Sequence, residues 1–166
     1  MSREHAIAIT LNGRPETLPA APGETLLEVL RRRGLVGCRE SCGQGVCGTC
    51  TVLVDGRTAA SCILLAHLVD GSAVGTVEGQ GRPGDLGVVQ RAFVAEAGFQ
   101  CGFCTPGMVL AATELLGENP DPGDDEITHH LAGNICRCGA YPEILRAVRR
   151  AAAMLRSGEA GGSDGG

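Results

Sequence analysis

Residues 34–56 read GLVGCRESCGQGVCGTCTVLVDG and hold four of the nine cysteines of this 166-residue chain. Three of them, Cys42, Cys47 and Cys50, follow the spacing C-x4-C-x2-C, and the residues between them are mostly small. Because glycine permits unusual dihedral angles and a close approach of the backbone, such a loop can wrap an inorganic core. We therefore expect these three thiolates to bind a metal centre.

The C-x4-C-x2-C spacing is typical of the plant-type ferredoxin loop, which binds a 2Fe–2S cluster together with a fourth, more distant cysteine. Cys62 is expected to be that ligand, since it follows the next hairpin, which returns the chain towards the loop. Cys38 could replace Cys42 only by spoiling the spacing, so we expect it to be a spare, partly buried apolar residue. Zinc is the alternative, but structural zinc sites usually present paired knuckles and this group has one.

The sequence on both sides of this loop alternates like a β-rich domain. Asn12-Gly13 and Asp55-Gly56 are hairpin-turn signals, and apolar residues at helical spacing that stop at Gly34 predict one short helix. The predicted elements are strands at 7–11 and 16–18, a helix at 26–33, and strands at 51–54, before residue 62 and at 73–77. This order predicts a ferredoxin-like β-grasp domain.

Beyond residue 78 the pattern changes from strands to helices. Residues 79–85 are rich in glycine and contain a proline, which predicts a linker. It would separate a β-grasp domain at residues 1–78 from a helical domain at residues 86–157. The tail at 158–166 has no apolar residue beyond alanine and is expected to be disordered.

Four short helices are predicted in the second half. Thr105 and Asp124 are expected to cap two of them, and Pro106 and Pro142 to open two. The four predicted helices cover residues 86–97, 106–116, 124–132 and 142–156. Their short connections indicate a compact helical bundle, so the whole chain is expected to be of the α+β class.

The helical half carries a second cysteine group, with Cys101 and Cys104 in CGFC and Cys136 and Cys138 in CRC. Four thiolates at two helix starts can converge if the helical hairpins pack face to face. The positive end of the helix beside Cys104 would favour any anionic thiolate centre. The spacing alone suits a zinc ion as well as an iron–sulfur cluster.

Composition and charge exclude several functions. The formal charge of -5 and the pI of about 5.3 leave no basic face for nucleic acid, and the four aromatic residues are too few for base stacking. The first residues lack the pattern of a signal peptide, and no apolar run is long enough to span a bilayer. We therefore expect a cytoplasmic protein, in which clustered cysteines bind metal or perform redox chemistry rather than form disulfides.

Two further stretches resemble a known family. QCGFCTPGM (Gln100–Met108) and GNICRCGAYPEIL (Gly133–Leu145) are similar to the helical cluster-binding domain of the molybdenum hydroxylases, such as xanthine dehydrogenase, aldehyde oxidoreductase and carbon monoxide dehydrogenase. Residues 34–56 are similar to the N-terminal β-grasp domain of the same family. The resemblance extends from about residue 5 to residue 157, with both motifs in the family's order and spacing.

The resemblance implies two 2Fe–2S clusters. It assigns the first to Cys42, Cys47, Cys50 and Cys62, and the second to Cys101, Cys104, Cys136 and Cys138. It also places Gln100 and Cys138 against a molybdopterin cofactor carried by a separate large subunit. Many relatives read C-R-C-T-G-Y where this chain has Gly139-Ala140 after Cys138, which could alter the fit beside that cofactor.

The same resemblance implies the function of an electron-transfer subunit within a hetero-oligomeric molybdenum-containing oxidoreductase. Electrons would pass from molybdenum through the helical-domain cluster to the β-grasp cluster, and then to FAD on a medium subunit or to another acceptor. No catalytic residue or substrate site is expected on this chain itself. The alternatives are a free-standing 2Fe–2S carrier and a zinc-stabilised interaction module; His67, His129 and His130 are not expected to be ligands.

Overall fold

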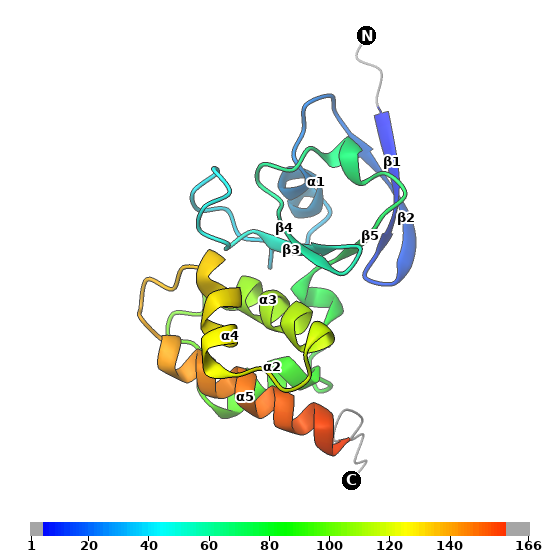
Figure 1. The fold of residues 1–166 in the computed structure, drawn as a ribbon. Helices are drawn as coiled ribbons and strands as arrows, with labels where there is room; N and C mark the ends of the chain where they lie inside the picture. Colours follow the sequence, from blue (N-terminus) through cyan, green and yellow to red (C-terminus); the bar gives the residue numbers. More distant parts are fainter. Residues whose placement is uncertain (1–4, 159–166) are drawn as a thin grey trace.

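The computed structural model describes residues 5–158 and divides them between two hydrophobic cores. The first core gathers buried residues between 7 and 74, and the second gathers buried residues between 89 and 152. Strands and one helix form the first unit, and the remaining α-helices form the second, below it in Figure 1. The predicted α+β class is therefore confirmed. The limits of the linker at 79–85 stay a prediction, and the tail from 159 onward lies outside the described residues.

The first unit is a mixed five-stranded sheet with the strand order β2-β1-β5-β3-β4. β1 pairs with β2 and β3 with β4 in antiparallel hairpins, whereas β1 and β5 run parallel. The hairpins turn at Asn12-Gly13 and Asp55-Gly56, where all four residues have positive φ, so both turn predictions are confirmed. The strands are β1 (His5–Leu11), β2 (Arg14–Ala20), β3 (Thr51–Val54), β4 (Arg57–Ala60) and β5 (Ala73–Gly75).

Helix α1 (Leu26–Arg32) buries its apolar residues against this sheet and completes the β-grasp. Its start is fixed by a capping box that the sequence pattern did not predict. The N–H of Glu28 donates to Thr25 Oγ1 over 3.3 Å, and the N–H of Thr25 donates to a Glu28 carboxylate oxygen over 2.8 Å. Two of the unpaired donors at the helix start are thereby satisfied.

The second unit contains all four predicted helices, with small corrections at their starts. Thr105 is the first residue of its helix and not the cap, Gly123 rather than Asp124 occupies the cap position, and the last helix begins at Tyr141. Gly123 takes the cap position because its backbone is already extended there. The helices are α2 (Val88–Ala95), α3 (Thr105–Glu118), α4 (Asp124–His130) and α5 (Tyr141–Ser157), with short 3-10 turns η1 (Ala66–Val69), η2 (Val77–Gly79) and η3 (Leu131–Gly133).

Helix α3 packs against β3 and β4 and joins the two units (Figure 1). Near its start, a Cβ atom on Gly107 would lie 2.3 Å from the carbonyl oxygen of Gly48, so only glycine allows this approach. Near its end, the buried Glu114 accepts hydrogen bonds from the N–H of Thr58 over 3.0 Å and from Thr58 Oγ1 over 2.7 Å. Arg57 Nε lies 3.2 Å from the same carboxylate. Helix α3 therefore fixes the two cysteine-bearing units against each other.

No helix within residues 5–158 is long and apolar enough to cross a membrane.

Candidate metal centres

The first cysteine group lies in the loop between α1 and β3, and the segment after β4 brings Cys62 to it. The N–H groups of Gln44 and Val46 each donate to Cys42 Sγ over 3.4 Å, and the N–H of Gly45 donates to Cys62 Sγ over 3.3 Å. The bonds from Gln44 and Val46, together with Cys47, lower the pKa of Cys42 to about 6, Gln44 contributing most. A loop whose N–H groups point at sulfur atoms stabilises anionic thiolates and tunes a bound centre.

The four cysteines of this group are arranged as two pairs. The side chain of Cys47 helps to lower the pKa of Cys42, and that of Cys50 helps to raise the pKa of Cys62, so each thiol has another beside it. Burial raises the pKa of Cys62 to about 11. The hairpin of β3 and β4 thus returns Cys62 to the loop.

The second group lies in the turns that precede α3 and α5. The side chain of Cys138 helps to lower the pKa of Cys101, and that of Cys136 helps to raise the pKa of Cys104, so the two turns bring these thiols together. Burial raises the pKa of Cys104 to about 12, whereas the N–H of Phe103 is the main cause that lowers the pKa of Cys101. Burial also acts to raise the pKa of Cys136, but backbone N–H groups, chiefly that of Ala140, outweigh it.

The possible metal centres differ in how they arrange four thiol ligands. In a 2Fe–2S cluster each iron takes two of the four protein ligands, so two neighbouring pairs of thiols fit its two irons. A structural zinc ion needs four ligands around a single position. Across residues 5–158, no three His, Cys, Asp or Glu side chains converge on one ion position. Both groups supply the four thiols that a two-iron cluster requires.

The other residues discussed in the sequence analysis lie in different parts of the structure. Cys38 is buried in the β-grasp core, where burial raises the pKa of its thiol to about 12. Gln100 and Cys138 are both exposed, as are the nearby aromatic rings of Phe103 and Tyr141. His130 Nε2 lies 3.1 Å from Glu114 Oε2, which gives this histidine a structural partner.

A contact that the sequence pattern did not predict joins the two cysteine groups. The N–H of Ile135 donates to the carbonyl oxygen of Cys47 over 2.9 Å. Beside it, the buried Asn134 donates from Nδ2 to the carbonyl oxygen of Gly48 over 2.9 Å and to Thr51 Oγ1 over 3.2 Å. No pattern in the sequence signals these bonds, because their partners are more than 80 positions apart.

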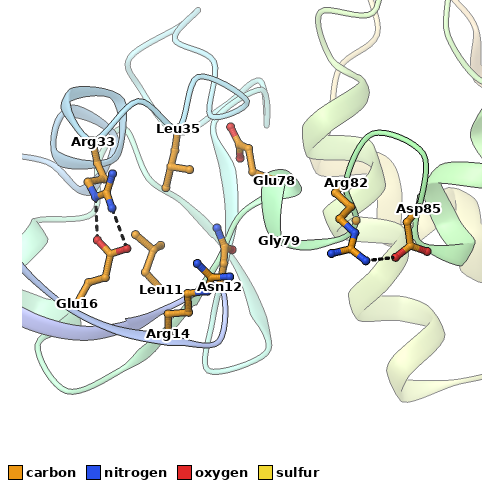
Figure 2. A pocket seen from close by; sticks show the side chains of 11 residues that line it. Leu11, Asn12, Arg14, Glu16, Arg33, Leu35, Glu78, Gly79, Arg82 and Asp85 are labelled. Carbon is orange, nitrogen blue, oxygen red and sulfur yellow. Dashed lines mark hydrogen bonds and ion pairs between the residues drawn. The ribbon is translucent and has the colours of Figure 1, made fainter.

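A cavity of about 400 Å³ lies beside η2 and the segment that follows it, and it is lined by no cysteine (Figure 2). Its charged lining is balanced. Arg33 pairs with Glu16 over 2.8 Å and Arg82 with Asp85 over 3.2 Å, while the Glu78 carboxylate accepts a hydrogen bond from the N–H of Gly37. This balance does not favour a charged ligand.

A β-grasp cysteine loop followed by a helical unit with two cysteine pairs defines the class of two-domain iron–sulfur proteins. Sequence models of two families match the chain accordingly. A 2Fe-2S iron-sulfur cluster binding domain matches residues 9–73, and a [2Fe-2S] binding domain matches residues 76–149.

Individual proteins similar to this chain indicate which family within this class it belongs to. The nicotinate dehydrogenase small FeS subunit of Eubacterium barkeri is 42% identical over 146 residues, covering 87% of this chain and 93% of its own. The xanthine dehydrogenase iron-sulfur-binding subunit of Escherichia coli O157:H7 is 43% identical over 144 residues, covering 86% of this chain and 91% of its own. A chain of the crystal structure of quinoline 2-oxidoreductase from Pseudomonas putida 86 superposes with a TM-score of 0.89 at 40% identity, over 95% of this chain and 99% of that one.

The chain belongs to the small 2Fe–2S subunits of the molybdenum hydroxylase family, of the xanthine dehydrogenase and aldehyde oxidoreductase type. It is the electron-transfer subunit of such an oxidoreductase, with two 2Fe–2S-binding domains. The predicted family, fold and function are thereby confirmed.

Proposed function

We propose that each thiol group of this chain holds one 2Fe–2S cluster, and that electrons cross the chain from the helical-domain cluster to the β-grasp cluster. The first ligand set is Cys42, Cys47, Cys50 and Cys62, and the second is Cys101, Cys104, Cys136 and Cys138. The observation that carries this proposal is the loop of residues 42–46, whose backbone N–H groups donate to the sulfur atoms of both Cys42 and Cys62. Each cluster, when bound, accepts one electron and passes it on.

The chain's own residues hold and orient these centres. The N–H groups of Gln44, Gly45 and Val46 point at thiol sulfur atoms in the first loop and favour their anionic form. In the second group, Cys104 and Cys136 are buried while Cys101 and Cys138 are exposed. One side of the second centre is therefore shielded from water and the other is open to a partner.

We propose that this open side faces a large subunit that binds molybdopterin, with Gln100 and Cys138 against the cofactor. Phe99, Phe103 and Tyr141, which are 38%, 41% and 47% exposed, lie within three positions of these cysteines in the sequence. Aromatic residues are enriched in protein interfaces, so their grouping here supports a protein partner at this side. A FAD-binding medium subunit would take electrons from the β-grasp side, and the cytoplasmic location expected from the sequence stays a prediction.

Purification of the tagged full chain from its native host tests the assembly. We expect a stable complex whose larger component releases a fluorescent pterin on oxidation and whose iron and labile sulfide are equimolar. A chain that carries both clusters but elutes as a monomer without pterin would establish the alternative of a free-standing carrier. A chain that carries zinc in place of iron would contradict both functions.

A further inference from the structure

Arg39 belongs to the loop of the first cysteine group, but its side chain reaches the second. Its guanidinium carbon lies 5.2 Å from the centroid of the Phe103 ring, over which it stacks. Phe103 stands between Cys101 and Cys104 in the turn of the second group. A cation from the β-grasp unit is therefore seated at the cysteines of the helical unit.

The backbone of Arg39 is fixed by the first loop. Its N–H donates to the carbonyl oxygen of Thr49 over 3.2 Å, and Thr49 Oγ1 donates to the carbonyl oxygen of Arg39 over 3.0 Å. The same Thr49 hydroxyl lies 3.2 Å from Cys47 Sγ. The backbone of Arg39 is thus held by residues of the first cysteine group, while its guanidinium lies at the second group.

The positive charge of Arg39 has no acidic counterpart in the part of the chain that the structure describes. No Asp or Glu oxygen within residues 5–158 lies within ion-pairing distance of its nitrogens, and its buried Nε has no hydrogen-bond partner there. A partly buried cation without a counter-charge is costly to a protein. An anionic thiolate centre beside Phe103 would supply that counter-charge.

We propose that Arg39 sets the reduction potential of the helical-domain cluster through its position over Phe103. Net charge and exposure are among the properties that set the potential of an iron–sulfur cluster. Reduction adds one electron and one negative charge to the centre, so a nearby cation stabilises the reduced form and raises the potential. This inference rests on the proposed pair of clusters. In this proposal Arg39 does not bind the cluster itself. Its charge adjusts the driving force of electron transfer between the two domains.

A redox titration of the full, cluster-loaded chain, followed by electron paramagnetic resonance, tests the proposal. The helical-domain signal is identified as the one altered in Cys101→Ser. In Arg39→Gln we expect the reduction equilibrium of this cluster to become about tenfold less favourable, which corresponds to about 59 mV for one electron. Arg39→Lys should restore most of the loss. Arg39→Met keeps an apolar side chain against Phe103. It should show the same less favourable reduction even if Arg39→Gln binds its clusters poorly.

Arg149→Gln is the matched control, since it removes the same charge from a surface pair with Asp124 and should leave both potentials unchanged. The proposal is overturned if Arg39→Gln and Arg39→Met keep the wild-type potential, or if both cluster signals shift equally. A wild-type chain without two 2Fe–2S signals would instead refute the proposed function. The two failures are therefore distinguishable.

Discussion

The backbone N–H of Ile135 and the carbonyl oxygen of Cys47 lie 2.9 Å apart, in a hydrogen bond between the helical unit and the β-grasp loop. Ile135 directly precedes Cys136 in the chain. The path from Cys136 to Cys47 therefore consists of backbone covalent bonds and this single hydrogen bond. Residues around this contact determine how the two candidate centres sit relative to each other.

Asn134→Ala is expected to weaken this junction. The change removes two hydrogen bonds from a buried side chain and leaves the carbonyl oxygen of Gly48 without that donor. The expected loss in the free energy of unfolding is about 1–3 kcal/mol. Denaturant unfolding of the full chain measures it. Asn119→Ala, which removes bonds to Glu126 on the surface, should cost less, and an equal loss in both variants would contradict the role of Asn134.

Gly107→Ala tests the close approach of α3 to the first cysteine loop. The new Cβ would meet the carbonyl oxygen of Gly48 at 2.3 Å, so the helix must shift, at a cost of about 1–3 kcal/mol. Gly117 is the control, because it lies in the same helix with no atom within 4 Å of an added Cβ. Gly117→Ala should be neutral or should stabilise by about 0.4–1 kcal/mol. Equal unfolding midpoints for the two variants would argue against the contact.

Much of this arrangement could be predicted from the sequence and some of it could not. The cysteine loop and the turns at Asn12-Gly13 and Asp55-Gly56 follow from local spacing, because glycine, asparagine and aspartate accept the backbone angles that the turns need. The contacts of Asn134 and Arg39 depend on how the two units pack against each other. No local pattern encodes such packing, so the sequence carries no signal for these residues. In the helical unit, spacing left zinc and iron–sulfur open, and only the family match distinguishes them.

The contact between α3 and β4 should weaken in acid. Burial acts to raise the pKa of Glu114, but hydrogen bonds from Thr58 and the charges of His130 and Arg57 hold it below its ordinary value of 4.5. Because the folded pKa is the lower one, this stabilisation is complete above about pH 4.5 and is lost as the pH falls through the folded pKa. The unfolding midpoint of Glu114→Gln should therefore be lower at neutral pH and less sensitive to acid. Glu118→Gln, which changes an exposed partner of Arg57, should keep the wild-type acid dependence.

Cys38→Ala should leave both clusters in place. The thiol is buried in the β-grasp core, and its pKa of about 12 keeps it protonated and unreactive. Cys62→Ala is the contrasting variant, since it removes a proposed ligand. Iron content and the visible spectrum compare the two. Loss of iron in Cys38→Ala, or full iron in Cys62→Ala, would show that the ligand assignment of the first group is wrong.

The central claim is that this chain holds two 2Fe–2S clusters in two different domains. Electron paramagnetic resonance of the reduced full chain tests it most directly, combined with the variants Cys47→Ser and Cys104→Ser. We expect two distinguishable 2Fe–2S signals, of which Cys47→Ser alters only one and Cys104→Ser only the other. A single signal, or one that both variants alter together, would contradict the account.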